Sequence, residues 1–176
     1  MIFHRLGLIH KNQRGFTLIE LLVAIAITGI ITGGITMTIF QVFAGNERTS
    51  NHMTAVRQVQ NAGYWISHDT QMAWEVAPDL GDTGFPLTLT WADWESGDVH
   101  QVIYTLLVDN KLQREHYTNL NLDATTIVAE YIDPDETSCV WDDGTGTLTL
   151  TVTATVSGWK SASETRVYEV VPRPGS

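Results

Sequence analysis

A long stretch without a single charged side chain, residues 21–46, constrains this chain more than any other feature. Together with the residues just before it, the stretch reads FTLIELLVAIAITGIITGGITMTIFQVF from Phe16 onward. A helix needs about 20 apolar residues to cross a bilayer, and this stretch is longer than that. The sequence therefore predicts one membrane-spanning helix near the N-terminus.

Three basic residues precede the predicted helix and indicate its direction. Arg5, Lys11 and Arg14 are the charged residues found before Gly15. Basic flanks of membrane helices stay preferentially in the cytoplasm. We therefore expect the rest of the chain to lie outside the cytoplasm.

Two ordinary explanations of the apolar stretch are a cleaved secretory signal and a plain membrane anchor. A secretory signal ends in small residues at its cut, and Thr32, Gly33 and Gly34 fit that description. Glu20 argues against both, because an acidic group at full membrane depth costs about 2.5 to 3.5 kcal/mol. Glu20 should therefore have a positively charged partner, unless its side chain merely reaches the membrane surface.

A short motif surrounds the start of the apolar stretch. Arg14 and Gly15 are followed by Phe-Thr-Leu-Ile-Glu and then by the apolar helix. This order resembles the cleavage and N-methylation signature of type IV prepilins. The resemblance implies that a prepilin peptidase cuts between Gly15 and Phe16 and methylates the new amino group, so that Phe16 becomes N-methylphenylalanine. It further implies that Glu20 meets the N-terminal amine of a neighbouring subunit.

Small residues are concentrated within the same predicted helix. Gly29 and Gly33 have the Gly-x-x-x-Gly spacing, and Gly34 follows directly. Small residues let neighbouring membrane helices approach closely, although glycine is also common in membrane helices that do not pair. Glycine is about 1 kcal/mol worse than alanine inside a helix, so we also hypothesise partial unwinding around Gly33 and Gly34 in an assembled filament.

Beyond the apolar stretch the composition turns polar, but a helical pattern continues. Steps of three and four residues place one set of mainly small and apolar side chains on a single face: Val56, Val59, Gly63, Ile66, Thr70 and Ala73. Polar side chains such as Asp69 are expected off this face. The helix should run to about Trp74, with Pro78 marking its end.

The remainder of the chain has the pattern of an antiparallel sheet. Apolar residues alternate with threonines along residues 147–156, which predicts a strand with one buried face. Asp109-Asn110 suits a tight hairpin between two predicted strands. The other expected strands are residues 87–91, 99–108, 111–118, 127–132 and 165–171. A long helix followed by such a sheet predicts an α+β fold, with the helix packed on the sheet as in pilins.

These patterns, together with the cleavage that the resemblance to type IV prepilins implies, predict four segments. Residues 1–15 form a leader peptide that is cleaved, and residues 16–46 form a transmembrane or filament-core helix. Residues 47–75 continue the helix as an amphipathic segment, and residues 76–176 form an extracytoplasmic β-sheet head. A chain of 176 residues is long enough for one such head.

Charge and cysteine content exclude some classes of function. The formal charge is −10, and removing the three basic residues of the leader gives −13. A chain this acidic repels phosphate backbones, so we expect no nucleic-acid partner. Cys139 is the single cysteine, so an intrachain disulfide is impossible, and the thiol is either buried or paired with a second chain.

The head shows no pattern typical of an enzyme, and we predict no catalytic residue or cofactor. Its acidic residues gather in turns, where carboxylates usually stabilise the backbone. Calcium is the one metal left open, with weak candidates in Asp133, Asp135 and Glu136. Their segment lacks the spacing and the glycine of an EF-hand loop.

The sequence therefore favours a structural subunit over an enzyme. Residues 102–114 loosely resemble the sheet of the larger minor pseudopilins. The prediction is a minor pseudopilin of type II secretion or a minor pilin of a type IV pilus-like filament, held in the inner membrane by one span. Its partners would be prepilin peptidase, other pilin or pseudopilin subunits and the inner-membrane assembly machinery. The alternative is an anchored or secreted domain whose head binds a ligand outside the cytoplasm.

Overall fold

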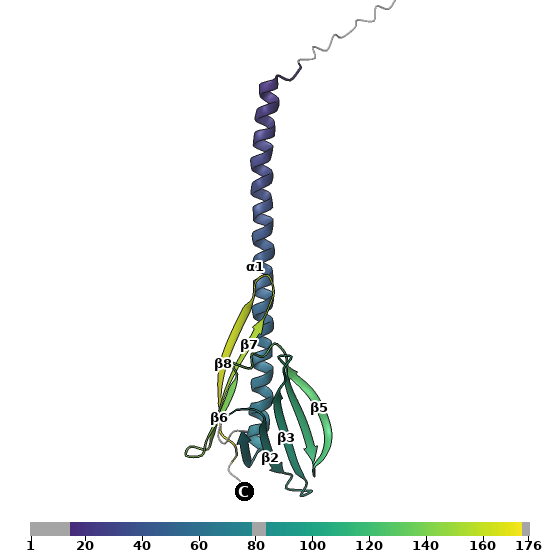
Figure 1. Cartoon of the computed structure of the whole chain (residues 1–176), viewed down its shortest axis with the longest axis vertical. Coiled ribbons are helices and arrows are strands. Elements are labelled where there is room, and N and C mark those ends of the chain that lie inside the picture. The colour runs from purple at the N-terminus through teal and green to yellow at the C-terminus, as the bar shows by residue number, and fades with distance from the viewer. Residues whose placement is uncertain (1–14, 79–83, 174–176) are drawn as a thin grey trace, which may run out of the picture. The chain divides into compact units, whose positions relative to one another are not determined.

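The computed structural model describes residues 15–78 and 84–173. The protein consists of two compact units, the first ending at Phe43 and the second beginning at Ala44. One long helix, α1 (Leu18–Met72), contributes its N-terminal part to the first unit and the rest to the second. The eight strands found among the described residues belong to the second unit, which we call the head (Figure 1).

Helix α1 is continuous through its glycines. The helix ends at Met72, slightly before the predicted end near Trp74. The amide of Trp74 already donates to the carbonyl of Thr90, 3.0 Å away, so the chain has joined a sheet at this point. The prediction that Pro78 marks the helix end is wrong, because Pro78 lies in the first strand instead, at a sheet edge where its missing N–H is tolerated.

Five strands form an antiparallel meander, in the order of the sequence. They are β1 (Glu75–Pro78), β2 (Leu87–Ala92), β3 (Val99–Leu106), β4 (Leu112–Thr118) and β5 (Asn121–Ala129). The predicted hairpin at Asp109-Asn110 is confirmed, since β3 and β4 pair on either side of it. Asn110 has φ of 62°, a left-handed conformation that asparagine tolerates better than most residues.

A second antiparallel sheet has three strands. They are β6 (Ser138–Asp142), β7 (Thr147–Val156) and β8 (Ala162–Val170). The alternation predicted for β7 is confirmed, because Leu148, Leu150, Val152 and Ala154 are all fully buried. The expected strand at residues 127–132 begins earlier, as β5, and β1 and β6 were not predicted at all.

The head packs α1 against both sheets around one apolar core (Figure 1). From α1 the core takes the small and medium-sized side chains of Ala55, Val59, Ala62 and Ile66, all fully buried. The α+β fold expected from the sequence is therefore confirmed, with a second sheet added. Apolar side chains from one helix face and from both sheets together form a core of ordinary composition.

Asp69 corrects the predicted helix face. Its side chain is only 1% exposed, and it accepts hydrogen bonds from the Tyr104 hydroxyl at 2.5 Å and from Arg114 Nε at 2.7 Å. Burial, with the neighbouring carboxylate, raises the pKa of Tyr104 well above its ordinary range, so the hydroxyl remains a donor. This network ties α1 to β3 and β4.

Candidate processing and assembly site

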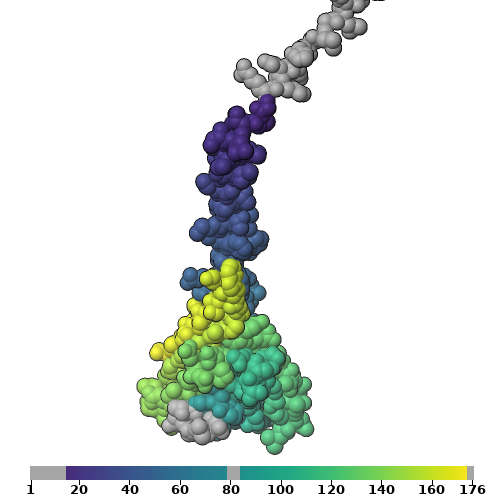
Figure 2. All heavy atoms as spheres, turned by 45° about the horizontal axis from the view of Figure 1, so that its top comes forward, coloured from purple at the N-terminus to yellow at the C-terminus, as the bar shows by residue number. Residues whose placement is uncertain are grey.

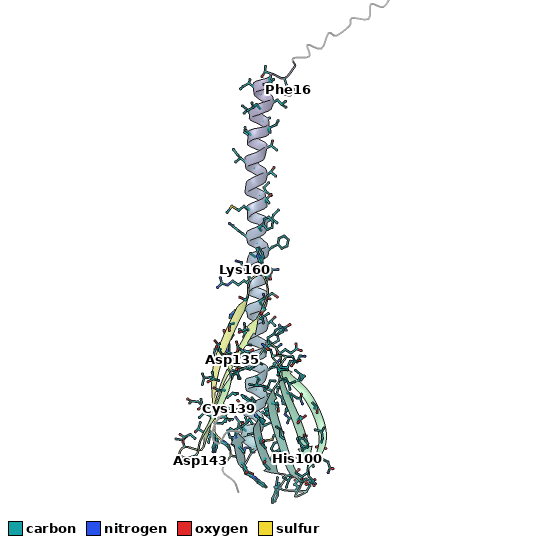
Figure 3. All side chains as sticks on the ribbon, in the orientation of Figure 1. Phe16, His100, Asp135, Cys139, Asp143 and Lys160 are labelled. Atoms are coloured by element: carbon teal, nitrogen blue, oxygen red, sulfur yellow. The ribbon has the colours of Figure 1, made fainter. Side chains whose placement is uncertain are left out.

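The residues before α1 are open to solvent in the single chain. Gly15 and Phe16 precede the helix and are both exposed, and the Phe16 ring is 90% exposed (Figure 3). Because Gly15 has no side chain, its backbone can enter a narrow protease cleft in an extended form. Residues 1–14, which include the predicted leader charges, lie outside the described residues.

Thr17 and Glu20 form a capping box at the start of α1. The Glu20 amide donates to the Thr17 hydroxyl at 3.3 Å. In return, the Thr17 amide and hydroxyl donate to Glu20 Oε2 at 3.1 and 3.0 Å. These bonds satisfy backbone donors that the first turn of a helix otherwise leaves open.

Thr17 is a site residue that the sequence reasoning missed. The signal was present, because Thr17-Leu18-Ile19-Glu20 has the Ser/Thr-x-x-Glu spacing of a capping box. All the described bonds to the Glu20 carboxylate reach Oε2. Within the described part of the chain, Oε1 therefore remains available to accept from another donor, since a carboxylate accepts several hydrogen bonds.

The glycines of the first unit lie on an exposed helix surface. Gly29 and Gly33 line a shallow hollow with Ala24, Thr28 and Thr32. A Cβ atom added at Gly29, Gly33 or Gly34 would meet no other part of the described chain within 4 Å. Packing inside the chain therefore gives no reason for glycine at these three positions.

Several threonine hydroxyls in this part of α1 donate to the backbone of the helix itself. Thr28 donates to the carbonyl of Ala24 at 2.8 Å, and Thr36 donates to that of Thr32 at the same distance. Such bonds to the preceding turn satisfy these two hydroxyl donors within the helix, which suits an apolar surrounding. Within the described residues, α1 is the helix long and apolar enough to cross a membrane.

Comparison with protein families finds a known motif at the start of the chain. The family described as the prokaryotic N-terminal methylation motif matches residues 10–36, which cover Gly15, Phe16 and Glu20. The chain carries a type IV prepilin signature. No curated protein and no solved structure shows a significant similarity to the chain. The prepilin signature and the apolar helix that follows it fit a membrane-anchored substrate of prepilin peptidase.

The weak calcium candidates do not converge on a common point. The amide of Asp135 donates to Asp133 Oδ1 at 3.1 Å, so this carboxylate stabilises a turn. Among residues 15–78 and 84–173, no three histidine, cysteine or acidic side chains are grouped so as to hold a metal ion. Glu136 is exposed on the same turn.

Cys139 is buried in the head rather than available to a partner chain. Its side chain has no exposed surface, and Sγ donates to the carbonyl of Gly84 at 2.7 Å. Burial raises the pKa of the thiol to about 12. A thiol enclosed in this way cannot form a disulfide with a second chain while the head is folded.

Proposed function

We propose that this protein is an assembly subunit, a minor pseudopilin of type II secretion or a minor pilin of a type IV pilus-like filament. The observation that carries the proposal is the prepilin signature, located directly at the start of an apolar helix with an exposed surface. A structural subunit requires no catalytic residues or cofactor, and we assign none. The proposed partners are prepilin peptidase, other pilin-like subunits and the inner-membrane machinery that assembles them.

Processing is the first step of the proposed function. Prepilin peptidase cleaves between Gly15 and Phe16 and methylates the new amino group of Phe16. The cut removes residues 1–15 and leaves the apolar helix in the inner membrane, with the head outside the cytoplasm. Residues 16–46 then span the membrane or the filament core, residues 47–75 continue onto the head, and residues 76–176 complete it.

Glu20 provides the proposed docking contact. Its carboxylate meets the N-terminal amine of a neighbouring subunit, and the pair neutralises two charges in an apolar surrounding. Removing one partner of a buried ion pair costs more than replacing both, because the remaining charge stays buried. The capping box supports this role, since Thr17 holds one carboxylate oxygen and leaves Oε1 to accept from the amine.

The glycine surface provides the proposed helix-packing contact. Gly29 and Gly33 line a hollow on the helix surface. A Cβ atom added at either of them, or at Gly34, would meet no other part of the described chain within 4 Å. Without a hydrophobic driving force in lipid, helices associate through close packing at small residues. A neighbouring subunit's helix would occupy this hollow in the filament.

Mass spectrometry of the mature protein tests the proposed function. After expression with a prepilin peptidase, the N-terminal peptide should begin at Phe16 and carry one methyl group. Gly15→Val should block the cut, because a branched side chain obstructs the cleft, whereas Gly7→Ala in the same leader should be processed normally. A mature protein that keeps its leader, or one cut after the apolar helix, would favour an anchored or secreted ligand-binding domain.

A further inference from the structure

The turn between β7 and β8, residues 157–161, is held tightly against α1. We call this turn the hairpin tip. The amide of Trp159 donates to Glu47 Oε1 at 3.0 Å, and Asn51 Nδ2 donates to the carbonyl of Lys160 at 2.7 Å. A Cβ atom at Gly158 would lie only 3.0 Å from Glu47 Oε1, so glycine permits this close approach.

Glu47, which accepts a hydrogen bond from the hairpin tip, lies directly after the apolar stretch of α1. Glu47 is the first charged residue after the uncharged residues 21–46. The other described hydrogen bonds between α1 and the strands or their connections lie further along the helix, beginning with Gln58, which accepts from the Glu130 amide at 2.9 Å. The hairpin tip is thus bonded to the helix where the polar part of the chain begins.

The hairpin tip carries an exposed aromatic side chain, Trp159, and a cationic one, Lys160, and neither is part of the apolar core. Trp159 is 63% exposed, and Lys160 Nζ lies 5.6 Å from the centre of its ring. Figure 2 shows the β8 end of the hairpin, in yellow, on the surface beside the helix, and Figure 3 labels Lys160 there. Internal packing therefore does not account for a tryptophan at this position.

The local charge at the hairpin tip differs from that of the whole chain. After residue 15 the chain has few basic residues: Arg48, Arg57, Lys111, Arg114, Lys160, Arg166 and Arg173. Lys160 lies in the tip, and Arg48 follows the tip's partner Glu47. The chain as a whole is acidic, but the hairpin tip and the adjoining residues of α1 carry no excess negative charge. Lipid phosphates therefore do not repel this part of the head.

We propose that the hairpin tip contacts the headgroup layer of the membrane while the subunit awaits assembly. Tryptophan and lysine are the side chains that settle at a membrane surface, with the indole among the carbonyl groups and the ammonium among the phosphates. The partner is a phospholipid surface, and the contact holds the head next to the point where α1 leaves the bilayer. This inference rests on the membrane-anchored state in the proposed function.

Tryptophan quenching in vesicles tests this contact with the full chain. The protein is reconstituted into vesicles of phosphatidylethanolamine and phosphatidylglycerol, and part of the lipid carries bromine near the carbonyl end of the acyl chain. Brominated lipid should quench part of the wild-type fluorescence, and Trp159→Phe should lose most of that quenching. Trp94→Phe is the matched control, because Trp94 is 91% exposed in the turn between β2 and β3, and it should keep the quenching.

A charge reversal gives a second measurement. Lys160→Glu should also reduce the quenching, because a carboxylate is repelled by lipid phosphates, whereas Lys111→Glu in the turn between β3 and β4 should not. Quenching that is equal in the wild type and Trp159→Phe, or equally lost in both tryptophan variants, overturns the contact.

The same preparation separates this inference from the proposed function. Flotation of the vesicles reports membrane anchoring, and its absence overturns both. The mass of the N-terminal peptide, measured on processed protein, reports the prepilin assignment alone. A correctly methylated protein without Trp159 quenching would leave the proposed function standing and exclude the hairpin tip as a membrane contact.

Discussion

At the scale of single residues, the buried carboxylate of Asp69 links distant parts of the head. Its Oδ2 atom accepts hydrogen bonds from the Tyr104 hydroxyl and from Arg114 Nε. The Arg114 guanidinium also lies over the Trp65 ring, with Cζ 5.1 Å from the ring centre. A buried ion pair of this kind stabilises a fold less than its geometry implies, because both charges lose their hydration. Removing only one partner is costly, however, since the other remains buried.

Replacing Asp69 should therefore destabilise the head strongly. We expect Asp69→Ala to lower the free energy of unfolding by about 3 to 5 kcal/mol, because Arg114 and Tyr104 lose their acceptor. Urea unfolding of the full chain in detergent, followed by tryptophan fluorescence, measures the change. The control is Asp109→Ala, which removes an exposed pair with Lys111 and should cost less than about 1 kcal/mol. Equal effects of the two substitutions would contradict the role of Asp69.

The thiol of Cys139 should be unreactive in the folded head. Its pKa of about 12 keeps it protonated at pH 8, and burial keeps reagents away. A thiol reagent should modify the native protein far more slowly than the protein in urea. Ser96→Cys, an added thiol in an exposed turn, should react at once in the same experiment. Rapid labelling of Cys139 in the native protein would show that the site opens.

The face of Asp69 could not have been predicted from the helical period. The helical period assigns polar side chains to the solvent-exposed face. This assignment fails where a buried carboxylate accepts hydrogen bonds from donors that lie far away in the sequence. Tyr104 and Arg114 lie on different strands, 35 and 45 positions beyond Asp69. The Thr17–Glu20 contact, in contrast, was predictable, because both residues lie within one helical turn.

At the scale of the elements, the two parts of α1 use glycine for different purposes. In the head, a Cβ atom at Gly63 would lie 2.2 Å from the Tyr168 ring, whose hydroxyl donates to the carbonyl of Val59 at 3.2 Å. Glycine is therefore required for β8 to lie against the helix. In the first unit, Gly33 faces open space.

Alanine substitutions should separate these two uses. We expect Gly63→Ala to lower the free energy of unfolding of the head by about 1 to 3 kcal/mol, because the added methyl group displaces Tyr168. Gly33→Ala should leave head stability unchanged and reduce incorporation into filaments. Urea unfolding and filament yield, measured for both variants, check the pair. A stable Gly63→Ala head would show that the Tyr168 ring moves aside without cost.

Strands were predicted where a period of two was long enough to recognise. β7 shows that period over its whole length. The turn at Asp109-Asn110 indicated where β3 ends and β4 begins. β1 and β6 were missed because they are short, with four and five residues. Pairing with β2 and β7 stabilises them, and no local pattern reports such pairing.

At the scale of the whole molecule, the two units have different relations to their surroundings. The head has its own core and satisfies its buried carboxylate internally. The part of α1 in the first unit, up to Phe43, is exposed throughout, so a membrane or other subunits must cover it. The match to the methylation motif covers residues 10–36 and so includes the first part of this helix. We therefore propose that the first unit carries the contacts for assembly.

The most direct test of this account is filament incorporation of Glu20→Ala. In cells that assemble the filament, the amount of protein in the sheared filament fraction is compared with the amount in the membrane. Glu20→Ala should be processed and inserted normally but largely lost from filaments, while Glu75→Ala, which removes an exposed carboxylate of the head, should enter them as the wild type does. Incorporation of Glu20→Ala at the wild-type level would contradict the account.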